Sequence, residues 1–140
     1  MAVSLKTNNL VLNKVEDLAP FSIASFQMAP KLLDAEFQNV ADKSPSFIEI
    51  SNQEKQVNIL LHNKADVLII DRYIFAYYCR HITNKECDDI VDYHYLFPKS
   101  QYSLAFTDKT LVAEFNKKLS LFLSSTAYKA LRTKYHFTAL

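Results

Sequence analysis

Glycine is absent from this 140-residue sequence. Because glycine normally supplies the left-handed backbone of tight turns, an Asn, Asp or Ser must take that conformation here. Asn63 follows the apolar pair Leu60 and Leu61, and we expect it in the left-handed position at a helix end. The absence of glycine also excludes the G-x-S-x-G nucleophile elbow, and no H-E-x-x-H motif occurs. With no motif for catalysis, we expect a protein that is not an enzyme.

An excess of charge of one sign is also lacking. Lys and Arg number 16 and Asp and Glu number 15, which gives a net charge of +1. A nucleic-acid-binding protein needs a basic run or patch that neutralises phosphates, and no such run occurs. We therefore expect no nucleic-acid partner. One aromatic-rich region has no basic patch beside it and is expected to pack in the core rather than to stack on bases. Its members are Tyr73, Phe75, Tyr77, Tyr78, Tyr93 and Tyr95.

Long hydrophobic runs are missing too. The longest aliphatic run, Val67 to Ile70, is far shorter than the roughly 20 residues that span a bilayer. The first residues, Met1 to Ser4, lack the charged and then apolar pattern of a signal peptide. Hydrophobic residues make up 49% of the chain and charged residues 22%, which is typical of a globular protein. We expect residues 1–140 to form a single domain.

Strand and helix patterns alternate along the chain. Short apolar segments predict strands, and apolar residues at helical spacing predict helices between them. Strands are expected at 21–25, 47–50, 66–70, 93–97 and 102–106, and helices at 30–40, from 51 onward, at 72–82, 111–122 and 125–135. The run Val67 to Ile70 is apolar throughout, as a strand covered on both faces should be. Ser51 and Glu54 have the spacing of a capping box.

This alternation predicts an α/β fold. Strands that are separated by helices need right-handed crossovers, so we expect a mostly parallel sheet with flanking helices. Ligands of such sheets bind beyond the carboxyl ends of the strands.

Several segments together carry a family resemblance. They are the acidic turn 15–18, the segment 21–29, the segment 58–78 that contains Asp71, and the closing helices in 102–135. Their order and spacing resemble those of the periplasmic solute-binding proteins of type 3, which serve amino-acid ABC transporters. The resemblance implies one lobe of a type II periplasmic-binding-protein fold.

The resemblance covers only part of a family member. Residues 3–97 resemble the second lobe, and residues 102–140 resemble the strand and helices that return to the first lobe. The signal peptide and the first lobe are then expected outside this chain, in a periplasmic protein.

The resemblance implies non-enzymatic binding of a small, polar, amino-acid-like solute by closure of two lobes. The implied partner is the membrane permease of an ABC transporter, and no cofactor is implied. A sensor module of a membrane signalling receptor with the same fold stays an alternative. Without a first lobe, the apolar stripe Leu111, Phe115, Leu119 and Phe122 should fold back on the second lobe or form a homodimer.

Asp71 is the first candidate ligand-binding residue. In the family, an aspartate at this point accepts hydrogen bonds from the ligand's α-ammonium group, so the resemblance implies this role for Asp71. From the residues alone, Asp71 is also a candidate N-cap of the helix that follows it. Both roles are compatible, because a cap at the carboxyl end of a strand points into the crevice.

The loop of Ser25, Gln27, Met28 and Ala29 is the second candidate. In the family, backbone N–H groups at a helix start and a hydroxyl hold the ligand's carboxylate here. This chain has Met28 and Ala29 where relatives carry Gly-Thr or Gly-Ser, so the hydroxyl is lost, and Pro30 has no N–H. The alternative is that Gln27 and Met28 are ordinary loop residues.

The cysteines allow more than one interpretation. Cys79 and Cys87 are candidates for a disulfide, which suits an exported protein, or for two free thiols. A zinc site formed by the two cysteines with His81 and His94 is disfavoured. Cys79 and His81 are two residues apart on a predicted helix, so their side chains point to different faces. We therefore expect no metal.

A receiver-like phospho-acceptor domain is the alternative from another class. Ala65 to Asp71 also resembles the phospho-acceptor strand of response regulators. A receiver needs an acidic pair after its first strand to hold Mg²⁺, and Ser25 to Gln27 provides none. The chemistry therefore favours solute binding.

Overall fold

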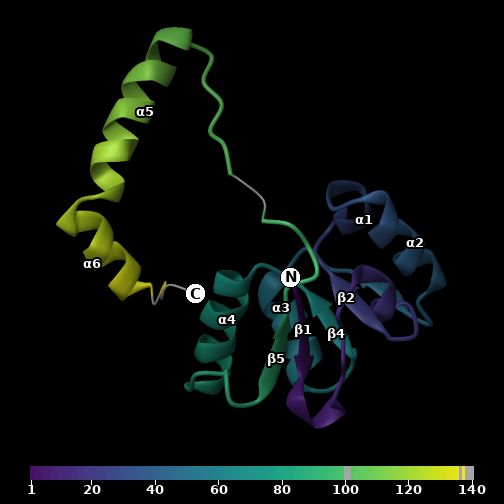
Figure 1. The fold of residues 1–140 in the computed structure, drawn as a ribbon. Coiled ribbons are helices and arrows are strands. Elements are labelled where there is room, and N and C mark those ends of the chain that lie inside the picture. The colour runs from purple at the N-terminus through teal and green to yellow at the C-terminus, as the bar shows by residue number, and fades with distance from the viewer. Residues whose placement is uncertain (100–101, 136, 138–140) are drawn as a thin grey trace. The chain divides into compact units, whose positions relative to one another are not determined.

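The computed structural model describes residues 1–99, 102–135 and 137. The chain forms two compact units, residues 1–98 and residues 99–140, and each is described separately (Figure 1). Among the described residues, no helix has both the length and the apolar character needed to cross a membrane.

The first unit is built on a five-stranded mixed sheet with the strand order β3-β2-β4-β1-β5. β2 lies parallel between β3 and β4, whereas β1 lies antiparallel between β4 and β5 (Figure 1). The strands are β1 (Ala2–Leu5), β2 (Ile23–Ser25), β3 (Phe47–Glu49), β4 (Val67–Ile69) and β5 (Val91–His94). The predicted α/β sheet is confirmed. The sequence pattern does not predict β1, which points opposite to the other strands.

Helices cover both faces of this sheet. They are α1 (Ala29–Leu32), α2 (Ala35–Lys43), α3 (Gln53–Leu61) and α4 (Arg72–Thr83), with short 3-10 helices at Lys6–Asn8 and Val15–Leu18. Residues of α3 and α4 share one core cluster with Leu68 and Ile70, and residues of α2 share the other with Val67 and Ile69. Because successive strand residues face opposite ways, a strand covered on both faces needs an apolar run such as this one.

Polar side chains set the ends of the helices. Asp34 caps α2, so the helix predicted over 30–40 is in fact two helices. Asn52 caps α3 by accepting a hydrogen bond from the backbone N–H of Lys55, so the predicted capping box of Ser51 is wrong. Asn is at least as good an N-cap as Ser, which explains the shift by one residue. Asn63 has a φ of 52°, the left-handed conformation that the lack of glycine predicts.

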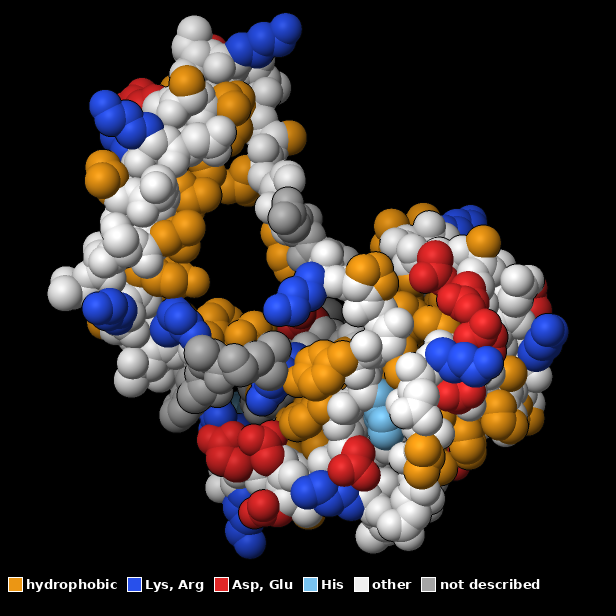
Figure 2. Space-filling model, in the orientation of Figure 1, with side chains coloured by type: hydrophobic (Ala, Val, Ile, Leu, Met, Phe, Trp, Pro, Cys, Tyr) orange, Lys and Arg blue, Asp and Glu red, His pale blue; other side chains and the backbone are white. Residues whose placement is uncertain are grey.

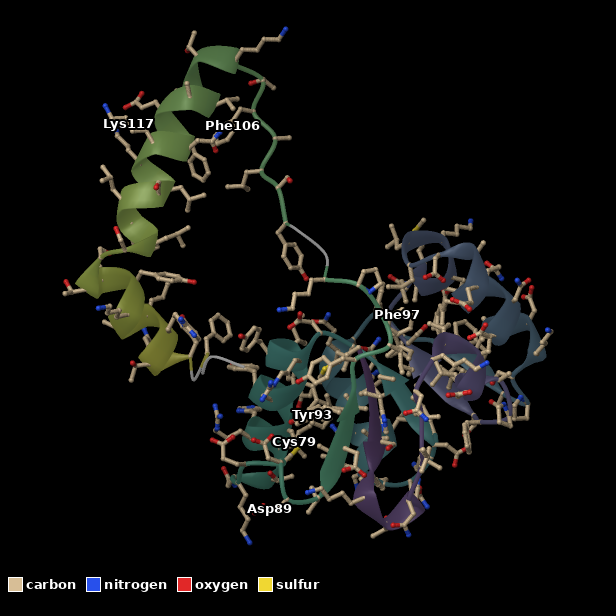
Figure 3. All side chains as sticks on the ribbon, viewed as in Figure 1. Cys79, Asp89, Tyr93, Phe97, Phe106 and Lys117 are labelled. Carbon is tan, nitrogen blue, oxygen red and sulfur yellow. A yellow bond between two sulfur atoms is a disulfide. The ribbon has the colours of Figure 1, made fainter. Side chains whose placement is uncertain are left out.

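The second unit contains two helices, α5 (Lys109–Leu123) and α6 (Thr126–Lys134). The strand predicted at 102–106 is wrong, because these residues have no regular structure. A strand is stable only beside partners, and the described part of this unit has no other strand. Phe106 instead points toward α5, where its ring centroid lies 5.1 Å from that of Phe115 (Figure 3).

The apolar stripe of α5 stays exposed in this unit. Leu111, Leu119 and Phe122 keep 45%, 37% and 41% of their surface exposed, and no described residue of α5 or α6 is buried. Figure 2 shows hydrophobic side chains gathered along both helices.

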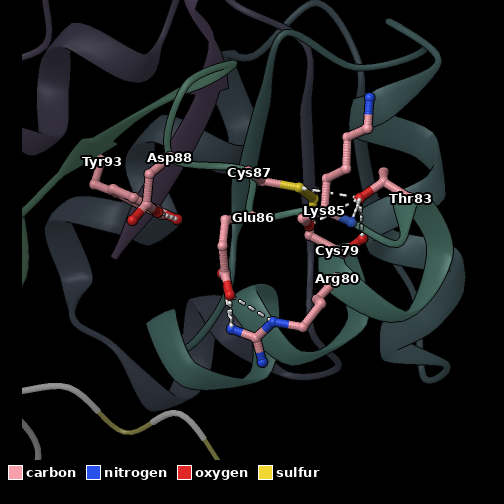
Figure 4. The surroundings of a disulfide bond; sticks show 8 residues. All are labelled: Cys79, Arg80, Thr83, Lys85, Glu86, Cys87, Asp88 and Tyr93. Carbon is pink, nitrogen blue, oxygen red and sulfur yellow. Dashed lines mark hydrogen bonds and ion pairs between the residues drawn. A yellow bond between two sulfur atoms is a disulfide. The ribbon is translucent and has the colours of Figure 1, made fainter.

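A disulfide ties the end of α4 to the loop before β5 (Figure 4). It joins Cys79 to Cys87, whose Cα atoms are 6.3 Å apart, a distance within the usual range for disulfides. Arg80 and Glu86 bridge the same loop, with Nε and Nη2 each 2.7 Å from a carboxylate oxygen. The loop is therefore held by a covalent bond and by a bidentate ion pair.

We expect reduction of the Cys79–Cys87 bond to lower the free energy of unfolding by about 2.5 kcal/mol, because the bond restricts the unfolded chain. Urea unfolding with and without a reductant measures this loss. The double variant Cys79→Ser/Cys87→Ser is the control. Its free energy of unfolding should equal that of the reduced protein and should not change when the reductant is added. An unchanged midpoint in fully reduced protein would contradict the prediction.

Candidate functional site

The carboxyl ends of the parallel strands meet at one edge of the sheet. β2 pairs with β4 so that Ser25 is opposite Ile69, and it pairs with β3 so that Ser25 is opposite Glu49. The turn after β2 and Asp71, two residues beyond β4, therefore lie at the same edge. The structure brings together the two segments in which the sequence analysis places the candidate ligand-binding residues.

Asp71 is half-buried and caps α4. Its Oδ1 accepts hydrogen bonds from the backbone N–H groups of Tyr73 (2.8 Å) and Ile74 (3.2 Å), so the predicted capping role is confirmed. Its Oδ2 accepts no hydrogen bond from any residue that the structure describes. One carboxylate oxygen thus fixes the helix start, and the other remains open to a donor.

The candidate residues of the turn after β2 differ in accessibility. Gln27 and Met28 are exposed, whereas Ser25 and Ala29 are fully buried. The Ser25 hydroxyl donates to the Phe26 carbonyl at 3.1 Å, so it serves the turn itself. Met28 adopts a left-handed φ of 61°, which is uncommon for a residue other than Gly, Asn or Asp.

Glu49 is a residue of this edge that sequence reasoning missed. Its Oε2 accepts a hydrogen bond from the backbone N–H of Met28 at 3.1 Å. No local sequence pattern predicts this contact, because Glu49 lies within a predicted strand. Only the pairing of β3 with β2 brings Glu49 to the turn.

Arg72 is a second residue that sequence reasoning missed. Its Nη1 donates to the Tyr95 hydroxyl at 2.9 Å, and its guanidinium lies 5.2 Å from the centroid of the Tyr93 ring. The Tyr93 hydroxyl donates to Asp88 at 2.7 Å, and burial, followed by this bond, raises the pKa of Tyr93. The sequence analysis predicts core packing for the aromatic region to which Tyr93 and Tyr95 belong. Phe75 of this region is fully buried, but Tyr95 is 57% exposed.

His94 connects β5 to β1. Its Nε2 lies 2.9 Å from Oγ of the buried Ser4, and its imidazole is close to the Leu12 backbone. Burial lowers the pKa of His94, and it outweighs the opposite effects of the Asp92 charge and the Leu12 backbone. The folded protein therefore favours the neutral imidazole.

Within the described residues, no three His, Cys, Asp or Glu side chains are arranged to hold a metal ion. Cys79 and Cys87 are bonded to each other, so neither offers a thiolate.

Comparison with solved structures identifies the fold. No family model and no curated protein matches this sequence. An ancestral arginine-binding protein bound to glutamine is 17% identical with a TM-score of 0.66, and the match covers 96% of this chain and 58% of that one. A P235GK mutant of the arginine-binding protein from T. maritima is 17% identical with a TM-score of 0.69, covering 98% of this chain and 57% of that one. An arginine transport-system periplasmic binding protein from Legionella pneumophila is 17% identical with a TM-score of 0.57, covering 96% and 59%.

The chain has the fold of one lobe of a periplasmic binding protein. It spans less than two thirds of the length of these binding proteins. The same topology argues against the receiver alternative. Receiver sheets have the strand order 2-1-3-4-5 of flavodoxin-like folds, whereas this sheet has the antiparallel β1 in its interior.

The capping role of Asp71 can be measured by substitution. We expect Asp71→Ala to lower the free energy of unfolding by about 1 kcal/mol, because the two N–H groups lose their acceptor, and Asp71→Asn to cost only a few tenths. Urea unfolding measures both. Asp34→Ala, which removes the cap of α2, is the matched control with a loss of similar size. Equal losses for the Ala and Asn variants of Asp71 would show that its charge, not its capping oxygen, stabilises the fold.

We expect stability to fall as the pH decreases below about 6.5, toward the lower pKa of His94 in the folded protein. The unfolded chain takes up the proton first, so acid favours unfolding in this window. Thermal unfolding between pH 7.5 and 5 at intervals of about 0.5 measures the slope. His94→Gln should lessen the slope and leave the part that comes from the partly buried N-terminal amine of Met1, whose pKa is also lowered, whereas His81→Gln, at an exposed position, should leave it unchanged. A slope in His94→Gln as steep as that of the unaltered protein would assign the whole effect to other groups.

Proposed function

We propose that this chain is the second lobe of a non-enzymatic solute-binding protein that captures an amine-bearing, amino-acid-like ligand. The observation that carries the proposal is the sheet topology, which is that of an amino-acid-binding lobe and which sets Asp71 beside the turn after β2. The carboxyl edge of such a sheet is where α/β proteins bind small ligands.

Asp71 receives the ligand's ammonium group in this proposal. Its Oδ2 is open to a donor, while the bonds from Tyr73 and Ile74 to Oδ1 hold the carboxylate in place. A carboxylate that is fixed before binding loses little conformational freedom when the ligand arrives. Hydrogen bonds between an ammonium and a carboxylate are also roughly twice as strong as neutral ones.

The turn after β2 provides the other ligand contacts. Gln27 and Met28 are exposed and line the site, whereas the buried Ser25 and Ala29 support the turn from within the unit. Ligand capture is then completed by a first lobe that closes over this edge, as the length of the structural neighbours suggests.

The apolar stripe of α5 has a role in the same proposal. Leu111, Leu119 and Phe122 are covered by the first lobe in the two-lobed protein. When the chain stands alone, a second copy covers the stripe and gives a homodimer, because large apolar side chains gain free energy on burial.

The proposed protein acts in the periplasm and delivers its ligand to the membrane permease of an ABC transporter. One structural neighbour is a periplasmic binding protein of an arginine transport system, which supports this assignment.

The experiment is isothermal titration of the full-length protein with arginine, ornithine, glutamine, agmatine and putrescine. We expect at least one of these amines to bind, and Asp71→Asn to weaken that binding about 10- to 100-fold, because a charge-assisted hydrogen bond becomes a neutral one. Asp34→Asn is the matched control, because Asp34 caps α2 and is not part of the proposed site. Failure of all five amines to bind would overturn the proposed function. Unchanged affinity in Asp71→Asn would overturn the role of Asp71.

A further inference from the structure

Three backbone N–H groups at the turn after β2 and the start of α1 are already in use. The N–H of Met28 donates to the Glu49 carboxylate at 3.1 Å, that of Ala29 to the Phe26 carbonyl at 3.3 Å, and that of Lys31 to the Met28 carbonyl at 3.0 Å. Pro30 has no N–H. α1 contains only four residues, which is too short for a strong positive end of a helix dipole. A ligand carboxylate would therefore find no free donor among Met28, Ala29 and Lys31.

Glu49 already occupies the position that an anionic ligand group would take. Its carboxylate accepts the Met28 N–H, and its other oxygen accepts no hydrogen bond from a described residue. A second carboxylate at the turn would have to displace Glu49 or lie against its negative charge. Like charges repel most strongly where water is excluded, as in a closed ligand site.

The β3-β2-β4 part of this edge presents acceptors and negative charge. Glu49 ends β3 and Asp71 follows β4, and these two strands are two strand spacings apart, which is about 10 Å. No described Lys or Arg forms an ion pair with either carboxylate. The guanidinium of Arg72 is directed toward β5, where it contacts the Tyr93 ring and donates to the Tyr95 hydroxyl.

A buried side chain packs next to the end of β3. Gln56 is fully buried, and its Nε2 donates to the carbonyl of Ile50, the residue after Glu49, at 2.7 Å. Its Oε1 accepts no hydrogen bond from any described residue. Buried polar atoms are nearly always paired, and this oxygen still lacks a donor among the described residues.

We infer that Glu49 selects the ligand class of this site: an organic cation with an ammonium or guanidinium at each end and no carboxylate beside the ammonium that Asp71 binds. This inference rests on the proposed function and narrows it. The two carboxylates, one ending β3 and one following β4 at the same edge, match a dication, and the N–H groups of Met28, Ala29 and Lys31 are already bonded.

The test uses two matched ligand pairs that differ only in the carboxylate, arginine with agmatine and ornithine with putrescine. Isothermal titration of the full-length protein should give at least tenfold tighter binding of the member without the carboxylate. Glu49→Gln keeps an acceptor for the Met28 N–H but removes the charge, so it should shrink that preference about tenfold. Glu49→Ala frees the N–H and should strengthen arginine binding in particular.

Glu54→Gln is the matched control, because Glu54 is an exposed acidic residue of α3 outside the proposed site, and it should leave the preference unchanged. Arginine or ornithine binding as tightly as its carboxylate-free partner would overturn the inference while the proposed function stands. A preference that persists in Glu49→Gln would also overturn it. Failure of all four ligands overturns it as well, and failure of glutamine in addition overturns the proposed function.

Discussion

The parallel pairing of β2 with β4 is the interaction on which the rest of this structure depends. It sets Ser25 opposite Ile69, so that the turn after β2 and the start of α4 open at the same edge. β4 is also hydrogen-bonded to β1 on its other side, and both of its faces are buried by helices. Because both faces of β4 are apolar, burial alone does not set this register, and reciprocal hydrogen bonds between Ser22 and Asp66, just before the two strands, help to fix it.

α4 is held at both ends, and this fixes the candidate site. Asp71 caps its first turn, and the Cys79–Cys87 disulfide and the Arg80–Glu86 ion pair secure its last turn. The contacts at the start of α4 are therefore set before any ligand binds. Side chains that are positioned in advance lose less entropy on binding, which is how a small edge of a sheet becomes a specific site.

The fold and the ligand chemistry are separate questions in this protein. The lobe has the topology of arginine-binding proteins, yet its turn after β2 carries Met28 in a left-handed conformation and directs its N–H to Glu49. A shared fold leaves the site residues free to vary, and specificity follows from the groups at the edge. In this chain the Glu49 and Asp71 carboxylates are hydrogen-bond acceptors at that edge, and the proposed preference for cationic ligands rests on them.

The sequence by itself determined the α/β class, the buried strand β4, the left-handed Asn63 and the capping role of Asp71, because these features depend on short-range interactions. Each of these follows from a short window, because caps, turns and apolar periods involve residues only a few positions apart. Only the tertiary structure decided the antiparallel position of β1, the meeting of Glu49 with the turn after β2, and the absence of a strand at 102–106. Strand pairing joins residues that are distant in sequence, and a segment becomes a strand only where a neighbour satisfies its backbone hydrogen bonds.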